Sequence, residues 1–80
     1  MSDEIERNEV MTVEYVRKPF YTTEDVRIII GAKNTSTVRM ARLNKRITAL
    51  DMSTRDLFFS PEEVQRFAAE DYNINLIFTT

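Results

Sequence analysis

Cysteine and histidine are absent from this sequence of 80 residues, and Gly31 is its single glycine. Without cysteine the chain can form no disulfide and no thiolate site. Without histidine it lacks the imidazole used by Cys/His zinc sites and by most catalytic triads. One glycine does not supply the repeated glycines of a phosphate-binding or dinucleotide-binding loop. We therefore expect a non-catalytic binding protein that uses no metal and no other cofactor.

The sequence also lacks a long hydrophobic run. The longest, Ile-Ile-Ile-Gly-Ala at residues 28–32, is too short to span a bilayer or to form the core of a secretory signal. We therefore expect a cytoplasmic protein with no membrane partner. The length suits one domain, and the composition, 42% hydrophobic and 30% charged, is that of a folded chain. We predict an acidic, flexible tail over residues 1–9 and a single domain over residues 10–80.

Charge is distributed unevenly along the chain, although the net charge is only −2. Residues 1–16 contain five acidic residues and one arginine, whereas residues 17–66 contain ten basic and six acidic residues. Within that middle block, residues 33–46 contain five basic residues and no acidic residue. Such a stretch is most often the solvated face of a helix, but it also suits a negatively charged partner such as nucleic acid.

The first third of the chain predicts a strand followed by a short helix. β-Branched and aromatic residues predict a strand over residues 10–16, which ends before Pro19. Thr22 or Thr23 is a suitable N-cap for the first helix, because a hydroxyl there accepts a backbone N–H. This helix is expected to end at Gly31, since a left-handed residue commonly follows the last turn.

A second helix is predicted over residues 36–44, after a polar turn, with Thr35 or Ser36 as its N-cap. At about 100° per residue, Val38 and Ala41 share one side of this helix, whereas Met40 and Leu43 fall elsewhere on the helical wheel, so the spacing leaves open which edge is buried. Its basic residues lie on the remaining surface.

The second half of the chain predicts a hairpin and a third helix. Extended runs at residues 46–50 and 55–59 are separated by four residues, which indicates a β-hairpin. Ser60 and Pro61 are the preferred residues at an N-cap and at the first helical position, and the third helix is expected to end near Glu70. The aromatic residues expected in the core are Phe20, Tyr21, Phe58, Phe59 and Phe67.

A final strand over residues 74–78 is expected to pair either with the strand over residues 10–16 or with a copy of itself in another chain. The element order is thus strand, helix, turn, helix, hairpin, helix and strand, which defines an α+β class. Two short helices around a turn form a helix-turn-helix, and a hairpin after them forms a wing. We predict a small winged helix-turn-helix with three short helices, a β-hairpin wing and additional N- and C-terminal strands.

Several motifs resemble the MerR-type winged helix-turn-helix of phage and transposon excisionases, which are recombination directionality factors. They are Tyr-Thr-Thr-Glu-Asp-Val at residues 21–26, Gly31, Ser-Thr-Val-Arg at residues 36–39, and Phe-Phe-Ser-Pro-Glu-Glu-Val at residues 58–64. The resemblance covers about residues 21–69. It implies that the second helix enters the major groove of DNA and that the wing reaches the adjacent backbone.

Ten residues are candidates for contact with DNA. Arginine can donate two hydrogen bonds to guanine, and hydroxyls or amines can contact phosphate. The residues implied at bases or phosphates in the major groove are Ser36, Thr37, Arg39 and Arg42, with Ser36 alternatively serving only as an N-cap. Those expected at phosphates are Lys33, Lys45 and Arg46. Those implied at the wing tip are Ser53, Thr54 and Arg55.

The sequence therefore favours a non-catalytic protein that binds double-stranded DNA sequence-specifically. It would serve as an excisionase-like accessory factor or as a small transcriptional regulator of a phage or mobile element. Further candidate partners are an integrase or recombinase, and copies of the same chain joined through the terminal strands. One alternative is a protein–protein interaction module that binds through exposed strand edges. Another is a subunit of a DNA-packaging assembly.

Overall fold

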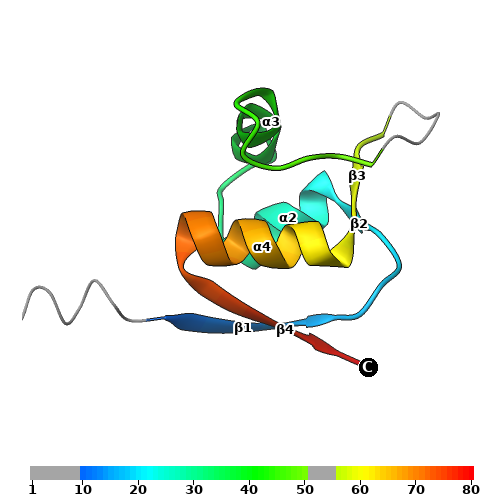
Figure 1. Ribbon diagram of the computed structural model, residues 1–80, viewed down its shortest axis with the longest axis vertical. Coiled ribbons are helices and arrows are strands. Elements are labelled where there is room, and N and C mark those ends of the chain that lie inside the picture. Colours follow the sequence, from blue (N-terminus) through cyan, green and yellow to red (C-terminus); the bar gives the residue numbers. More distant parts are fainter. Residues whose placement is uncertain (1–9, 51–55) are drawn as a thin grey trace, which may run out of the picture.

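The computed structural model describes residues 10–50 and 56–80, and within them it has a small α+β fold. Figure 1 shows the arrangement: two central helices lie between a strand pair on one side and a third helix on the other. The helices are α2 (Thr23–Ile30), α3 (Ser36–Leu43) and α4 (Pro61–Tyr72). The strands are β1 (Met11–Val16), β2 (Tyr21–Thr22), β3 (Phe58–Phe59) and β4 (Ile74–Thr79).

The first and last strands pair in parallel, so the expected pairing within one chain is confirmed. The register runs from Met11 opposite Ile74 to Val16 opposite Thr79. Successive side chains of a strand point to opposite faces of a sheet. Ile74 and Leu76 accordingly face the core, while the intervening Asn75 is exposed.

Local capping chemistry determines where α2 begins and ends. The Thr22 side chain accepts the N–H of Asp25, and the Asp25 side chain accepts the N–H of Thr22, which together form a capping box. Gly31 follows α2 with φ of 74°, a left-handed conformation that glycine adopts without steric cost. The predicted boundaries of this helix are confirmed, with Thr22 as the cap.

Helix α4 begins as predicted and ends later than predicted. The Ser60 hydroxyl accepts the N–H of Glu63, and Pro61 is the first helical residue. The helix continues past Glu70 to Tyr72, because Asn73 provides the left-handed residue that ends it, with φ of 55°.

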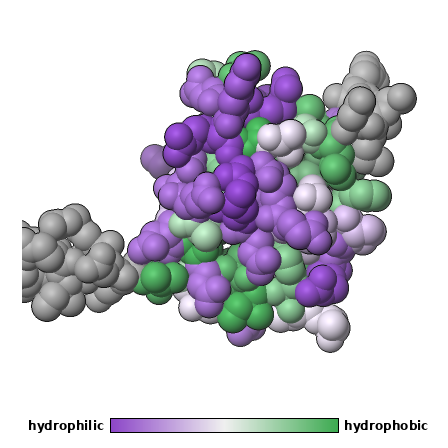
Figure 2. Space-filling model, viewed as in Figure 1, coloured by the Kyte–Doolittle hydropathy of each residue, from purple (hydrophilic) through white to green (hydrophobic). Residues whose placement is uncertain are grey.

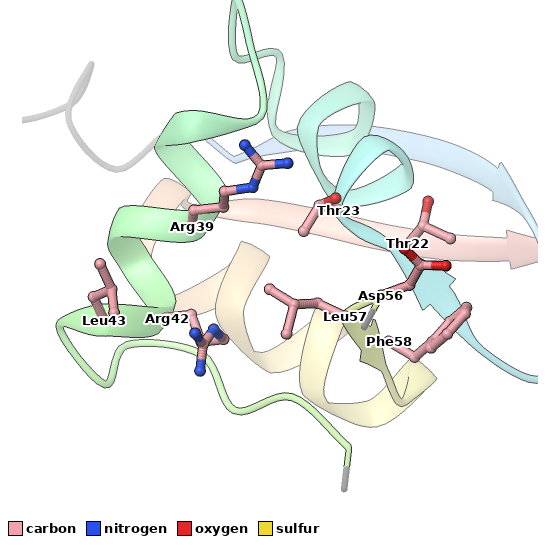
Figure 3. A pocket seen from close by; sticks show the side chains of 8 residues that line it. All are labelled: Thr22, Thr23, Arg39, Arg42, Leu43, Asp56, Leu57 and Phe58. Atoms are coloured by element: carbon pink, nitrogen blue, oxygen red, sulfur yellow. The ribbon is translucent and has the colours of Figure 1, made fainter. Parts of the chain in front are cut away.

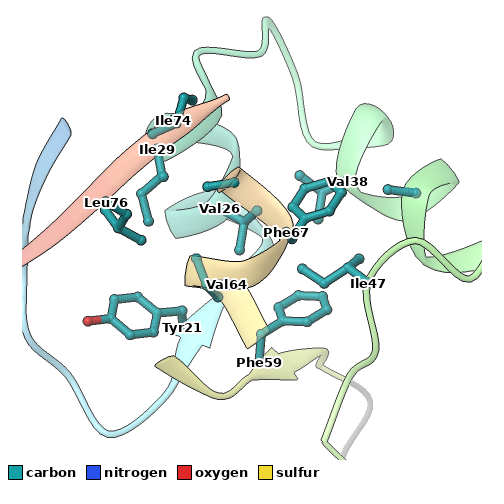
Figure 4. Close-up of a cluster of buried hydrophobic side chains, with 12 residues drawn as sticks. Tyr21, Val26, Ile29, Val38, Ile47, Phe59, Val64, Phe67, Ile74 and Leu76 are labelled. Carbon is teal, nitrogen blue, oxygen red and sulfur yellow. The ribbon is translucent and has the colours of Figure 1, made fainter. Parts of the chain in front are cut away.

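The core lies where α2 and α4 pack against each other, against β4 and against the inner side of α3 (Figure 4). Its buried residues are Tyr21, Val26, Ile29, Val38, Ala41, Ile47, Phe59, Val64, Phe67, Ala68, Ile74 and Leu76. The expected burial of Phe20 is wrong, since its side chain is 44% exposed and meets Phe58 edge to face at the surface.

The hairpin expected from residues 46–50 and 55–59 does not form as predicted. Within the described chain, residues 46–50 adopt no strand, and β3 pairs antiparallel with β2 instead. One hydrogen bond of the expected kind is present, from the Leu50 N–H to the Phe58 carbonyl at 2.7 Å. Two backbone N–H groups of the first expected strand are bonded elsewhere: the Arg46 N–H donates to the Ala41 carbonyl, and the Thr48 N–H donates to the Glu63 carboxylate at 2.8 Å.

Candidate nucleic-acid interface

Helix α3 is attached to the core along a narrow strip. Of its eight residues, Val38 and Ala41 are buried and the other six are exposed, so the structure decides the buried edge that the helical spacing left open. The helix therefore lies on the outside of the molecule, beyond α2 and α4 (Figure 1). Figure 2 shows that the surface in this region is mostly hydrophilic.

The start of α3 uses a cap that the sequence pattern did not predict. Thr35 occupies the N-cap position in a helical conformation, and its side chain makes no capping hydrogen bond. The Asn34 side-chain oxygen instead accepts both the N–H and the hydroxyl of Ser36, with the N–H at 3.0 Å. Thr35 is thus confirmed at the N-cap position, but the capping hydrogen bond expected from its side chain is absent, and the Ser36 hydroxyl proton is engaged by Asn34. Thr37 is exposed at the same end.

The end of α3 is closed by two backbone hydrogen bonds of the Schellman type. The Lys45 N–H donates to the Arg42 carbonyl at 3.0 Å, and the Arg46 N–H donates to the Ala41 carbonyl at 2.8 Å. Lys45 sits at the left-handed position with φ of 63°. This position usually holds glycine, because a side chain crowds the backbone there.

A hollow of about 510 Å³ separates α3 from the start of α2 and from β3. Its lining residues are Thr22, Thr23, Arg39, Arg42, Leu43, Asp56, Leu57 and Phe58. Figure 3 shows that Arg39 extends from α3 toward Thr23. The structure thus brings together two predicted site residues, Arg39 and Arg42. It also adds neighbours that lie far apart in sequence and that the local pattern did not indicate.

The basic residues of the described chain fall into two groups. Those that form ion pairs are Lys18 with Asp25, Arg27 with Glu24, Arg46 with Asp71, and Arg66 with Glu63 and Glu70. Arg17 lies over the ring of Phe78 at 5.2 Å. Among residues 10–50 and 56–80, the basic side chains with no acidic or aromatic partner are Lys33, Arg39, Arg42 and Lys45.

Arg46 differs from the other predicted phosphate contacts because it is already paired. Its guanidinium donates to both carboxylate oxygens of Asp71, at 2.9 and 2.8 Å. This hydrogen bonding raises the pKa of Arg46 and lowers the pKa of Asp71. A phosphate contact by Arg46 would have to displace or share this carboxylate. The wing-tip candidates, Ser53, Thr54 and Arg55, lie outside the described residues.

Two further observations bear on the class of protein. In the part of the chain that the structure describes, no group of acidic residues is arranged to hold a metal ion. Over the same residues, no helix combines the length and the apolar character needed to cross a membrane.

Comparison of the chain with protein-family models, with curated proteins and with solved structures found no match.

Proposed function

We propose that this protein binds double-stranded DNA sequence-specifically through α3 and has no catalytic role. One observation carries the proposal: the four basic side chains without a partner in the described chain, Lys33, Arg39, Arg42 and Lys45, all lie on α3 or its flanks. Unneutralised cations gathered at one surface attract a polyanion, and phosphate contacts supply much of the affinity of DNA-binding proteins.

The dimensions of α3 suit the major groove. An α-helix with its side chains is about 10–12 Å across, which fits the major groove of B-DNA, about 12 Å wide, and the eight residues of α3 give it a length of roughly 12 Å. Because only two of its residues are buried, the helix can enter the groove without leaving the core. Arg39 and Arg42 are three residues apart and so lie on one face, from which they can reach base edges. Lys33 and Lys45, beyond the two ends, are suited to phosphates on either side.

The arrangement of α2, the turn and α3 also supports a helix-turn-helix interpretation. In that interpretation the segment between α3 and β3 is the wing, and β2 pairing with β3 anchors its end to α2. Together with the motifs at residues 21–26 and 58–64, this supports an excisionase-like accessory factor or a small regulator of a phage or mobile element.

The test measures binding to double-stranded DNA by fluorescence anisotropy at a series of salt concentrations. The probes are duplexes of random sequence and duplexes selected from a random pool. Each phosphate neutralised contributes about −0.9 to the slope of log K against log salt. We expect Lys45→Gln to weaken binding to all probes alike and to reduce the magnitude of the slope by about 0.9. We expect Arg42→Gln to weaken binding to selected probes more than to random ones.

Arg27→Gln is the matched control, because it removes the same charge from a helical arginine that is already paired with Glu24. It should change neither the slope nor the preference for selected duplexes. The proposal fails if the wild-type protein does not bind duplex DNA at low salt. It also fails if Arg27→Gln weakens binding as much as Arg42→Gln does.

A second candidate function is a protein–protein interaction module. The observation that favours it is the exposed outer edge of β1, on the side of the molecule opposite to α3 (Figure 1). An exposed strand edge can pair with an added strand. Failure of the DNA test would favour this function.

A further inference from the structure

Among residues 10–50 and 56–80, the sheet formed by β1 and β4 has two strands, so each of them has an outer edge there. The Met11 N–H donates to the Asn73 carbonyl at 3.2 Å, and the Arg17 N–H donates to the Thr79 carbonyl at 2.7 Å. In a strand, alternate residues direct their backbone groups to opposite sides. The odd-numbered residues of β1 therefore face β4, and the backbone groups of Thr12, Glu14 and Val16 face outward.

Each outer edge of the sheet has one carbonyl that already accepts a side-chain hydrogen bond. On the β4 edge, the Gln65 side chain from α4 donates to the Leu76 carbonyl at 2.8 Å. On the β1 edge, the Tyr21 hydroxyl donates to the Val16 carbonyl at 2.9 Å. Over the described residues, the outward backbone groups of Thr12 and Glu14 have no hydrogen-bond partner. The residues whose backbone groups face outward differ in burial: Ile74 and Leu76 on β4 are 5% and 1% exposed, whereas Thr12 and Glu14 on β1 are exposed. The β1 edge is therefore the more accessible template for another strand.

Exposed apolar side chains also lie on β1 and at its start, with Val10 and Val16 on one face of the sheet and Met11 on the other. Val10, Met11 and Val16 are 55%, 65% and 48% exposed, which is unusual for large hydrophobic residues at one strand. Apolar surface is also visible on this side of the molecule in Figure 2. An added strand would cover these side chains and satisfy the open backbone groups together.

We propose that β1 pairs antiparallel with β1 of a second copy of this chain, about a two-fold axis at Val13. The outward backbone groups belong to even-numbered residues. A symmetric antiparallel pair must therefore place even-numbered residues of one copy opposite even-numbered residues of the other. A register centred on Glu14 would place two carboxylates opposite each other, which is destabilising. The register centred on Val13 instead places Val10 opposite Val16 of the second copy and Thr12 opposite Glu14. The Val16 carbonyl already accepts the Tyr21 hydroxyl, and its second lone pair accepts the Val10 N–H of the second copy. The result is a continuous sheet in the order β4–β1–β1–β4.

This interface is short and supports a weak dimer. Pairing along residues 10–16 buries much less than the roughly 1,600 Å² typical of a stable complex. Two copies on neighbouring DNA sites would pair more readily, because binding to one DNA raises their effective concentration. That consequence rests on the proposed function, whereas the pairing itself does not. Figure 1 places α3 on the side away from β1 and β4, so both surfaces can be used at once.

The chain has no cysteine, so one introduced cysteine is the only thiol and any disulfide must join two copies through it. This crosslinking test is carried out without DNA. In the proposed register Val13 faces its own symmetry mate at a non-hydrogen-bonded position, where Cα atoms are about 4.5 Å apart. That distance permits a disulfide. We expect Val13→Cys to form a disulfide-linked dimer under mild oxidation several-fold faster than Thr12→Cys does.

Thr12→Cys is the matched control, because it faces Glu14 of the second copy in this register. Thr12 is exposed whereas Val13 is half-buried, so random collisions would crosslink the Thr12→Cys protein faster. Equal or faster crosslinking of Thr12→Cys overturns the proposal, as does the absence of crosslinking in both variants.

A proline variant tests the same edge without relying on a thiol. The Thr12 N–H faces outward, so Thr12→Pro removes a donor from the edge and leaves the bonds between β1 and β4 intact. The monomeric fold, followed by circular dichroism, should persist, and concentration-dependent self-association in sedimentation should be lost. Unchanged self-association overturns the proposal. If the Val13→Cys dimer forms but the wild-type protein does not bind DNA, the pairing stands and the proposed function falls.

Discussion

Asp25 is the only buried charged side chain among the described residues, and it joins three segments of the fold. One carboxylate oxygen accepts the Tyr15 hydroxyl at 2.6 Å and the Lys18 ammonium at 2.9 Å. The other accepts the N–H and the hydroxyl of Thr22, at 3.0 and 3.1 Å. The carboxylate thus connects β1 and the following loop to the first turn of α2. Replacing it tests whether this network holds the outer sheet on the helices.

Asp25→Asn keeps one oxygen and converts the other into an NH₂ donor of nearly the same size. If the oxygen remains toward Thr22 and preserves the cap, the amide nitrogen faces Tyr15 and Lys18. Two charge-assisted hydrogen bonds are then lost, and such bonds contribute roughly 1.5–3 kcal/mol each. Lys18 is partly exposed and can turn to water, which reduces its share. We expect a loss of about 3 kcal/mol, from a total stability of roughly 4–12 kcal/mol for a chain of this length.

The assay is urea denaturation monitored by circular dichroism. A change in stability moves the urea midpoint and leaves unchanged the slope of the unfolding free energy against urea concentration. Glu24→Gln is the control, because it changes the neighbouring residue, whose carboxylate pairs with Arg27 at the surface. It should cause a much smaller loss, since exposed ion pairs contribute little. The reasoning is refuted if Asp25→Asn is no more destabilising than Glu24→Gln.

The pH dependence of stability gives an independent reading of the same carboxylate. Burial alone raises the pKa of Asp25, but the hydrogen bonds from Thr22, Tyr15 and Lys18 outweigh it and hold the pKa below its ordinary value of 3.8. A carboxyl whose pKa is lower in the folded state stabilises the fold above its ordinary pKa, and that stabilisation is lost as the pH falls through the folded-state pKa. Wild-type stability should therefore fall more steeply than that of Asp25→Asn as the pH is lowered below 4. An equal loss of stability in the wild type and in Asp25→Asn as the pH falls below 4 would contradict this.

Two further predictions concern residues with positive φ. Lys45→Gly should stabilise the protein by about 0.5–1 kcal/mol, because relief of the left-handed strain exceeds the entropic cost of glycine. Thermal unfolding measures this gain. Lys45→Gln is the control, because it keeps a side chain and should show no gain. Gly31→Ala should destabilise it by about 1 kcal/mol through backbone strain alone, since an added Cβ meets nothing within 4 Å. A urea midpoint for Gly31→Ala equal to that of the wild type would contradict the second prediction.

Local chemistry made much of the fold predictable. Thr22, Gly31 and Ser60 act on backbone groups within a few residues of themselves, so their positions in the sequence were enough to place helix ends. Helical spacing placed Val38 and Ala41 on one side of α3, but only the packing of the helix shows that this side is the buried one. The cap at Asn34 was missed because the turn before α3 is bonded through a side chain outside the standard pattern.

Pairing between distant segments could not be read in the same way. Phe58 and Phe59 have the composition of a hairpin strand, but they pair with β2. Leu50 keeps one hydrogen bond to Phe58, whereas the N–H groups of Arg46 and Thr48 are bonded to Ala41 and Glu63, which are outside the expected hairpin. The sequence left two partners open for the last strand: the first strand of the same chain, or a copy of itself in another chain. The structure assigns β4 to β1.

The same division applies to the candidate site. The sequence by itself determined that residues 33–46 carry five positive charges and no negative charge, and that cysteine and histidine chemistry is excluded. Only the tertiary structure decided which of those charges remain available. Arg46 lies in the same basic stretch as Arg39 and Arg42, yet the packing of α4 brings Asp71 to it from 25 residues away. Charge is a property of the residue, whereas its neutralisation depends on which distant groups the fold places beside it.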